Sequence, residues 1–566
     1  MLHPFQHITD LSEICYRNGV QYVVISPGSR NAPLIDAFFS RFQDRCYSIV
    51  DERSAGYFAL GIARYLQSPV VLICTSGTAV LNYSPALAEA YYSQIPLLAI
   101  TADRPAEWID QQDNQTIRQK EVYKNFIKKS YYLPERIENT RLLNAFHRQM
   151  YDAFSCTSNE PKGPVHLNVP INEPLYTEIP VCSKNISLPA SVKKSEEIHI
   201  PDELKTAWQN AEKIFIVHGQ DRPHSEVREV LSILSERPGI VVIAENISNI
   251  KDDKIISHTD LLFAHNNAHL LQSPDLLLYS GGQVVSRRLK NYLRNLKSLP
   301  TWRIGIDDYP MDTFKQKNRI LSVSPANVYK QLLHMKQVGN AHSDFRENWH
   351  HASAHAMNRR EELIRYVPFS DVLAMKIILD ALPGGSILEL GNSSVVRMYQ
   401  FFNYPGDIEI FSNRGVSGID GCLSAAVGTA SISNKITLAI IGDLSFIYDS
   451  NALWNRRLPP NLRVIVLNNE GGGIFSVLEG PSSKPAYEDF FIAYHPVNMQ
   501  KLAEAFNLHY FCADDEQSLV SELSRFFQPA GKAGVLEIKT KRQNNVQAFQ
   551  MILGKNVSSN KQKPIT

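Results

Sequence analysis

Two loops in the last third of the chain carry residues suited to holding a metal ion and a diphosphate. The apolar run 437–441 leads into the sequence GDLS, and the apolar run 464–467 leads into NNEGGG. Asp443 offers a carboxylate oxygen, Asn469 an amide oxygen and Gly471 a main-chain carbonyl. Phosphate oxygens and water would complete the octahedral shell that Mg²⁺ requires, and glycine-rich turns let backbone N–H groups approach phosphate. The two loops therefore predict a magnesium diphosphate site.

Either loop alone is typical of an ordinary surface turn. Their pairing favours function, because the twenty-five residues between Asp443 and Asn469 suffice for one helix between adjacent strands. The pair resembles the signature of thiamine diphosphate enzymes, which begins Gly-Asp-Gly and ends Asn-Asn. Leu444 replaces the last glycine of the opening triplet, which is a departure from that pattern. The resemblance implies cofactor-binding residues at Gly442, Asp443, Leu444, Ser445, Asn469 and Gly471.

Glu52 follows the apolar run 47–50 and precedes a segment rich in small residues. Thiamine diphosphate reacts through a C2 carbanion, which needs a carboxyl group at N1′ of the aminopyrimidine. An acid in the first turn of a helix is also favoured simply by the helix dipole. The segment DERSAGYFALGIA nevertheless resembles the glutamate segment of the thiamine enzymes, so we expect Glu52 to activate the cofactor.

Further strings resemble one family, the 2-succinyl-5-enolpyruvyl-6-hydroxy-3-cyclohexene-1-carboxylate synthases of menaquinone biosynthesis. They are SPGSRNAPL (26–34), TSGTAVLNYSPALAEA (75–90), TADRP (101–105), DNQTIRQ (113–119), GNSSVVRMY (391–399) and SNRGVSGIDGCLSAAVG (412–428). The resemblance is strong in the first and third parts of the chain and is limited to SRRL (286–289) in the middle. It implies a transferase that decarboxylates 2-oxoglutarate and adds the succinyl unit to isochorismate.

The same resemblance implies a substrate site rich in cations. The two substrates bring four carboxylates between them, which bidentate arginines recognise well. A single arginine is more often a solvated surface residue than a ligand, but six occupy matching positions. The expected catalytic set is Glu52, Gln115 and Arg30. The expected substrate contacts are Ser29, Arg30, Arg104, Gln115, Arg287, Arg288, Ser393, Arg397 and Arg414.

Four apolar residues match the walls of the family's reaction cavity. Ile419 corresponds to the residue that supports the thiazolium, and Ile474, Phe475 and Leu478 to the cavity wall. Ordinary core burial explains each of them equally well when judged alone. Ser393 and Ile419 also count among the expected cofactor contacts.

These loops need parallel sheets to position them. Short β-branched runs alternate with helix-length segments in three series, which predicts an α/β protein of three consecutive doubly wound parallel-sheet domains with the thiamine diphosphate-binding fold. We expect a pyrimidine-binding domain at 1–180, a central domain at 200–340 and a diphosphate- and magnesium-binding domain at 355–566. The stretch from Val181 to Ile200 is predicted to be a linker, and the stretch around 340–360 a linking helix.

Composition excludes several classes of protein. Fifty-eight basic against 57 acidic residues give a net charge of +1, so nothing favours nucleic acid or an anionic membrane. The N-terminal residues lack the features of a secretory signal, and seven scattered cysteines favour a reducing compartment. We therefore expect a cytoplasmic protein. The loops with Asp443 and Asn469 imply Mg²⁺ as the metal, with Mn²⁺ as the alternative. The family resemblance implies a homodimer with shared active sites, or a homotetramer.

Two alternatives remain open from the sequence. Another thiamine-dependent carboligase or decarboxylase, such as an acetohydroxyacid synthase, would take small neutral acyl units. A non-catalytic α/β nucleotide-binding protein would keep the fold without the chemistry, although it would have no reason to retain Glu52, Asp443 and Asn469 together. The histidines at 350, 351 and 355 could suggest a metal cluster, but a linking helix is the simpler reading.

Overall fold

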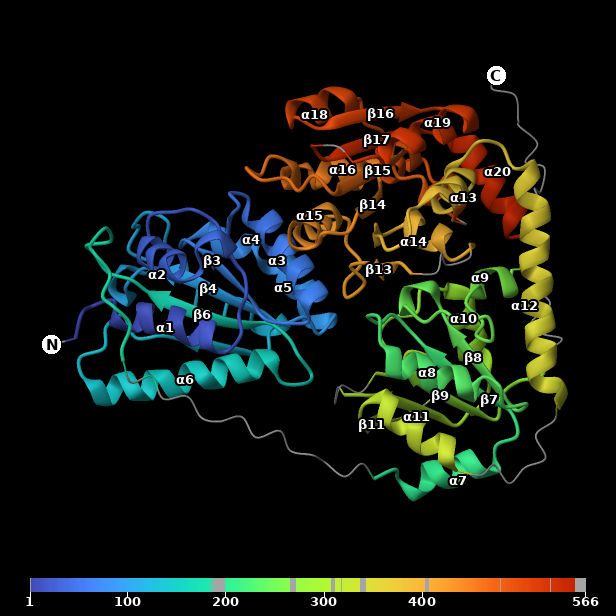
Figure 1. Ribbon diagram of the computed structural model, residues 1–566, viewed down its shortest axis with the longest axis horizontal. Coiled ribbons are helices and arrows are strands. Elements are labelled where there is room, and N and C mark those ends of the chain that lie inside the picture. Colours follow the sequence, from blue (N-terminus) through green and yellow to red (C-terminus); the bar gives the residue numbers. More distant parts are fainter. Residues whose placement is uncertain are drawn as a thin grey trace.

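The computed structural model describes residues 2–184, 186, 199–264, 271–306, 311–316, 318–335, 343–402, 407–478, 480–529 and 531–554. Three parallel sheets follow one another along the chain, each between layers of helices (Figure 1). The predicted fold class is thereby confirmed. The predicted linker from Val181 to Ile200 lies mostly outside the described residues.

The first sheet has six strands in the order β2-β1-β3-β4-β6-β5, all parallel. Its order reverses between β1 and β3, which opens a crevice at the carboxyl ends of those strands. The strands are β1 (Val23–Ile25), β2 (Cys46–Ser48), β3 (Val70–Cys74), β4 (Leu97–Asp103), β5 (Lys129–Tyr132) and β6 (Val165–Pro170). The helices are α1 (Gln6–Arg17), α2 (Ala32–Phe42), α3 (Glu52–Leu66), α4 (Thr78–Asn82), α5 (Ser84–Tyr92) and α6 (Thr140–Ser158).

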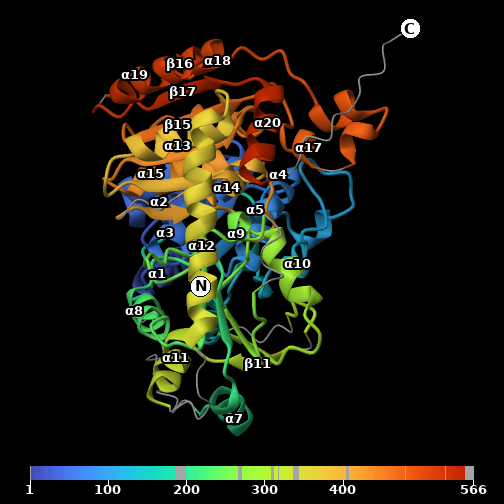
Figure 2. The ribbon, with the colours of Figure 1, turned by 90° about the vertical axis from the view of Figure 1, so that its right-hand side faces the viewer.

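The central sheet has five strands in the order β11-β10-β9-β7-β8. They are β7 (Ile214–His218), β8 (Ile240–Ala244), β9 (Leu276–Ser280), β10 (Thr301–Gly305) and β11 (Arg319–Ser322). The surrounding helices are α7 (Asp202–Asn210), α8 (Ser225–Leu234), α9 (Thr259–Leu262), α10 (Arg287–Asn295) and α11 (Pro325–His334). Helix α12 (Ser343–Leu363) then runs along one side of the molecule from the central to the third domain, as both ribbon views show (Figures 1 and 2).

The third sheet repeats the topology of the first, in the order β13-β12-β14-β15-β17-β16. Its strands are β12 (Ile387–Leu390), β13 (Glu409–Phe411), β14 (Thr437–Gly442), β15 (Leu462–Asn468), β16 (His509–Ala513) and β17 (Gly534–Lys539). Its helices are α13 (Asp371–Ala381), α14 (Ser394–Tyr399), α15 (Cys422–Ile432), α16 (Asp443–Tyr448), α17 (Ile474–Val477), α18 (Met499–Ala505), α19 (Glu516–Phe526) and α20 (Arg542–Ile552). The order reverses between β12 and β14, so the loops carrying Ser393 and Asp443 border one crevice.

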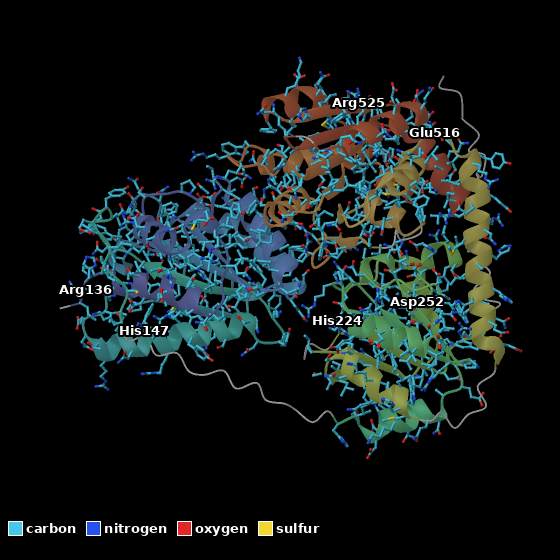
Figure 3. All side chains as sticks on the ribbon, in the orientation of Figure 1. Arg136, His147, His224, Asp252, Glu516 and Arg525 are labelled. Carbon is cyan, nitrogen blue, oxygen red and sulfur yellow. The ribbon has the colours of Figure 1, made fainter. Side chains whose placement is uncertain are left out.

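Apolar side chains fill the layers between sheets and helices (Figure 3). Several buried polar groups in these layers bind one another. His147, labelled in Figure 3 on α6, donates through Nε2 to Asp10 of α1 at 2.7 Å. That hydrogen bond ties two helices on the same face of the first sheet.

The first and third domains meet through α3 and α15. Small residues allow the two helices to approach closely, because a side chain at Gly61 would strike the carbonyl of Ala425 and one at Gly428 would strike that of Phe58. Ser54 and Ser424 exchange a hydrogen bond of 2.9 Å across this contact. The small-residue run after Glu52 is therefore explained by helix packing between domains.

Candidate active site

The two predicted metal loops lie side by side at the carboxyl end of the third sheet, because β14 and β15 are neighbours in it. The backbone N–H of Gly471 donates to Oδ2 of Asp443 at 2.7 Å. Gly471 has a φ of +140°, and a side chain there would strike the carbonyl of Ile492. A glycine is thus required for the second loop to reach the first.

The side chain of Asn469 is oriented by a residue that the sequence did not single out. Its Nδ2 donates to Oδ2 of Asp371 at 2.8 Å, while Oδ1 of Asp371 accepts from Thr540 at 2.6 Å. This leaves Oδ1 of Asn469 buried with no hydrogen-bond partner. An orphaned amide oxygen beside a carboxylate and a glycine turn fits the coordination of a hard divalent cation.

The opening loop is shaped to admit a phosphate. A side chain placed at Gly442 would meet nothing within 4 Å, so open space lies in front of this residue. Ser445 donates to the carbonyl of Ile419 at 2.8 Å, which ties the metal loop to the segment after β13. Leu444 is half-buried, and its N–H donates to Oδ1 of Asp443. Leu444 is thus accommodated in the first turn of α16.

His495 lies next to this site, and the sequence did not predict it. Nε2 of His495 lies 3.2 Å from Oδ2 of Asp443. Nothing in the local sequence around His495 signals this, since the contact depends on the fold of the segment after α17. Across the described ranges, no group of three or more His, Cys, Asp or Glu side chains is arranged to hold a metal ion, and this covers His350, His351 and His355 on α12.

Glu52 is the first residue of α3, and Asp51 caps the helix by accepting from the N–H groups of Arg53 and Ser54. Burial raises the pKa of the Glu52 carboxyl, and the neighbouring Asp51 acts in the same direction. A carboxyl group with a raised pKa is suited to sharing a proton with a ring nitrogen. The geometry of this helix start therefore agrees with the role expected for Glu52.

The residues that follow Glu52 bind the third domain. Arg53 donates to the carbonyl of Asp420 and lies 3.2 Å from Oδ1 of Asp449, while Tyr57 donates to Oδ2 of Asp420 at 2.9 Å. Burial raises the pKa of Asp449 to about 7. Within one chain, the glutamate helix is thus held against the domain that carries the metal loop.

One group of predicted substrate residues gathers at the carboxyl edge of the first sheet. Arg30 is buried and donates to the carbonyl of Ile171 at 3.0 Å, and burial lowers its pKa, with Arg104 adding to the effect. Arg104 is paired with Asp113 at 3.1 Å. The carbonyl of Gln115 accepts from Ser76 at 2.8 Å, and Ser29 is exposed at the end of the loop after β1.

A second group lies between the central and third domains. Arg414 is buried, donates to Oδ1 of Asn392 at 2.9 Å and leaves its Nε without a partner. Arg397 donates to the carbonyl of Ser393. Burial lowers the pKa of both arginines. The charge of Arg397 lowers the pKa of Arg414 further, and the charge of Arg287 does the same to Arg397. In the described part of the chain, no hydrogen bond or ion pair links this group directly to Arg30 or Arg104.

The start of α10 holds the arginine pair of the central domain. Arg288 lies 3.9 Å from Asp260, and Arg287 is exposed. Glu245 accepts hydrogen bonds from the N–H groups of Val285 and Ser286, just before the helix. Burial raises the pKa of Glu245 to about 7. Burial lowers the pKa of Lys290, which the sequence did not single out; the charges of Arg414, Arg294 and Arg397 act in the same direction, and Glu245 opposes them. Helical spacing from Arg287 was the signal that could have identified Lys290.

The predicted thiazolium support and the three predicted cavity walls are not core residues. Ile419 is 36% exposed and Leu478 is 42% exposed, while Ile474 and Phe475 are only half-buried in a short helix. Core burial, the competing explanation, therefore does not account for them. A separate cavity of about 530 Å³ lies between α2, β2 and residues 455–457, and none of the predicted site residues lines it.

Comparisons with known proteins agree with this geometry. Residues 8–122 match the model of the thiamine pyrophosphate enzyme N-terminal TPP binding domain, and residues 390–538 match that of the C-terminal TPP binding domain. The 2-succinyl-5-enolpyruvyl-6-hydroxy-3-cyclohexene-1-carboxylate synthase of Desulfotalea psychrophila is 42% identical, over 92% of this chain and 95% of that protein. The synthases of the same name from Flavobacterium psychrophilum and Christiangramia forsetii are 38% and 36% identical, over 90% and 94% of this chain and 92% and 95% of theirs. None of the described helices has the length and apolar composition needed to span a membrane.

Proposed function

The chain belongs to the 2-succinyl-5-enolpyruvyl-6-hydroxy-3-cyclohexene-1-carboxylate synthase family of thiamine diphosphate enzymes, and on that premise we propose that it joins 2-oxoglutarate to isochorismate with loss of CO₂. The product would enter menaquinone biosynthesis. The observation that supports this choice of substrates is the pair Arg397 and Arg414, which follow strands of the same sheet as the metal loop; Arg414 is buried and Arg397 is half-buried. A site for pyruvate, which brings a single carboxylate, would need fewer arginines than a site for 2-oxoglutarate and isochorismate.

The metal site would be formed by Asp443, Asn469 and the carbonyl of Gly471, with Mg²⁺ or Mn²⁺ as the ion. Asp371 would keep the amide of Asn469 turned so that its oxygen faces the cation. Gly442, Leu444 and Ser445 would surround the diphosphate. Thiamine diphosphate, when bound, would supply the nucleophilic carbon and the electron sink that decarboxylation requires.

The chain's own residues would transfer the proton, support the cofactor and exclude water. The Glu52 carboxyl would hold a proton at N1′ of the aminopyrimidine, a role favoured by its raised pKa. Ile419 would support the cofactor from below, and Ile474, Phe475 and Leu478 would keep water from the reacting carbon. Each of these side chains lies on a loop or helix end that follows a strand of the first or third sheet.

The two arginine groups would bind the two substrates separately. Arg397, Arg414 and Ser393 belong to the same domain as the metal loop and Ile419, and would hold the carboxylates of 2-oxoglutarate. Arg30, Arg104, Gln115 and Ser29 would orient isochorismate from the first domain, and Arg287 and Arg288 would add charge from the central domain. Arg30 and Gln115 would then be the catalytic neighbours of the accepting ring.

We also propose a homodimer that works in the cytoplasm. All seven cysteines are free thiols, which suits a reducing compartment. The surfaces that join α3 to α15 could equally join the first domain of one copy to the third domain of another, since the linker between domains is long. That arrangement would bring Glu52 of one subunit to the metal loop of its partner, and two such dimers could form a tetramer.

An assay with both substrates tests the function. We expect loss of isochorismate and formation of the succinyl adduct, detected by mass, only when thiamine diphosphate and Mg²⁺ are both present. Conversion of pyruvate to acetolactate without consumption of 2-oxoglutarate would refute the substrates and leave the cofactor. Absence of any turnover with either 2-oxo acid would favour a non-catalytic protein.

A further inference from the structure

Glu89 is a buried carboxylate in the first domain whose partners lie in the third. It belongs to α5 and is 2% exposed. Its Oε1 accepts from the backbone N–H of Gly415 at 2.6 Å, and its Oε2 accepts from Val416 at 2.7 Å and Ser417 at 3.4 Å. Three successive backbone N–H groups of one loop thus converge on one side chain.

Burying a carboxylate costs free energy unless donors hydrogen-bond to it. A buried carboxylate needs several donors, and charge-assisted hydrogen bonds to backbone N–H groups are among the stronger ones in proteins. Ser93 supplies a further donor, since its hydroxyl lies 2.8 Å from Oε1. The Glu89 carboxylate therefore accepts four hydrogen bonds, three of them from this loop.

The loop is built for this contact. A side chain at Gly415 would approach the carbonyl oxygen of Glu89 and the hydroxyl of Ser93, each at 2.6 Å. Ser417 adopts a φ of +68°, and its N–H donates to the same carboxylate as those of its two predecessors. The sequence of the loop thus agrees with the position of Glu89.

The loop carries two residues of the proposed site. Arg414 immediately precedes the three N–H groups, and Ile419 follows them. The end near Ile419 has its own contacts, because Ser445 binds the carbonyl of Ile419 and Tyr57 binds Asp420. The end near Arg414 has the contact with Glu89, together with that of Asn392 to the guanidinium.

We propose that Glu89 is a positioning residue: it fixes the backbone after Arg414 and so holds that guanidinium where the carboxylate of 2-oxoglutarate binds. This rests on the proposed function, because it assigns Arg414 to that substrate. Since Ile419 is held separately, loss of Glu89 should affect substrate affinity far more than cofactor affinity. Glu89 touches neither substrate nor cofactor in this scheme.

The test compares Glu89→Gln with Glu89→Asp and with the exposed control Glu138→Gln, all as full-length protein with thiamine diphosphate and Mg²⁺. For Glu89→Gln we expect amide exchange at 415–417 to accelerate about tenfold and KM for 2-oxoglutarate to rise about tenfold, as loss of a charge-assisted hydrogen bond predicts. We expect kcat and the cofactor dissociation constant to change by less than about threefold. Glu89→Asp should show smaller changes in the same direction, and Glu138→Gln none.

Three outcomes would overturn the inference. They are unchanged amide exchange in Glu89→Gln, faster exchange with an unchanged KM, and equal losses of cofactor and substrate affinity. If Glu89→Gln does not fold, the same measurements on Glu89→Asp decide. Failure of the wild type to turn over 2-oxoglutarate would refute the proposed function, and amide exchange would then still decide whether Glu89 holds the loop.

Discussion

The side-chain amide of Asn469 donates to Oδ2 of Asp371 at 2.8 Å, and this one hydrogen bond leaves Oδ1 as the end of the amide that is free to bind a metal. Asp371 is fully buried and is itself held by Thr540 and Asn545. Residues behind a metal ligand commonly fix its orientation in this way. The proposed metal site thus depends on a carboxylate that does not touch the metal.

We predict that Asp371→Asn weakens binding of Mg²⁺ and thiamine diphosphate by about tenfold to a hundredfold. The new amide could accept from Thr540 or from Asn469 but not from both. The measurement is a titration of the cofactor-free protein with Mg²⁺ at fixed thiamine diphosphate, followed by tryptophan fluorescence. Asp380→Asn, on the exposed face of the same helix, is the control and should bind as the wild type does. Equal affinities for the two variants would contradict the role of Asp371.

Much of the architecture could be predicted because buried parallel strands have a clear pattern. The apolar runs 437–441 and 464–467 lie within β14 and β15. Two other strands have weaker patterns. β16 is a sheet edge with half-buried residues, and β6 is fully buried yet contains His166 and Asn168, whose hydrogen bonds to Thr101 replace water. The sequence around β6 therefore looks polar although the strand is central.

The residues of the candidate site also divide into those that a local pattern reveals and those that it does not. Loops directly after predicted strands, such as those with Asp443 and Asn469, could be found from spacing and type. Asp371 and Glu89 could not, because they act on partners far away in the sequence and each looks like an ordinary helix residue. Contacts between residues distant in the sequence depend on how the elements pack, which a local sequence pattern does not reveal.

Glu52→Gln should abolish most turnover while leaving the cofactor bound. A glutamine can occupy the same space but cannot share a proton with N1′, and loss of such proton transfer costs about a hundredfold to ten-thousandfold in rate. The measurement pairs kcat with the rate of deuterium exchange at C2 of thiamine diphosphate on the enzyme. Glu121→Gln, an exposed acid of the same domain, serves as control. Full activity in Glu52→Gln would disprove the activation mechanism.

Ile419→Ala should reduce activity without the loss of stability that a core substitution causes. The side chain of Ile419 is 36% exposed, whereas Ile410 in β13 is 1% exposed. A buried isoleucine replaced by alanine costs about 2–5 kcal/mol, and a partly exposed one costs much less. Chemical unfolding and kcat of Ile419→Ala and Ile410→Ala check this. If Ile419→Ala is as unstable as Ile410→Ala, the residue belongs to the core and not to the reaction cavity.

Asp449 predicts a pH dependence of stability at the contact between the first and third domains. Burial raises its pKa from 3.8 to about 7. A carboxyl whose pKa is raised by folding favours the folded state below its unfolded pKa, and this contribution is lost as the pH rises from about 3.8 to about 7.

Asp449→Asn removes that titration. We expect the melting temperature of the wild type, relative to that of the variant, to fall by about 2–4 °C between pH 5 and pH 8. The amide also disturbs the hydrogen bonds to Ser424 at every pH. The test is therefore how the difference between the two melting temperatures changes with pH, and not its size at one pH. Asp514→Asn, at an exposed position, should give a constant difference. A constant difference for Asp449→Asn as well would show that Asp449 is ionised across this range.

Mixing two inactive variants decides whether the active site is shared between subunits. Glu52→Gln removes the activating carboxyl and Asp443→Ala removes a metal ligand, so each homodimer should be inactive. If Glu52 of one copy serves the metal loop of the other, a mixed dimer has one site with both defects and one with neither. Random exchange of subunits in an equal mixture would then restore about a quarter of the wild-type rate per chain. If α3 serves the metal loop of its own chain, every site in the mixed dimer keeps one defect, and mixing restores nothing. Light scattering on the mixture establishes that dimers are present, and a mixture of Glu52→Gln with wild type gives the reference for the exchange of subunits.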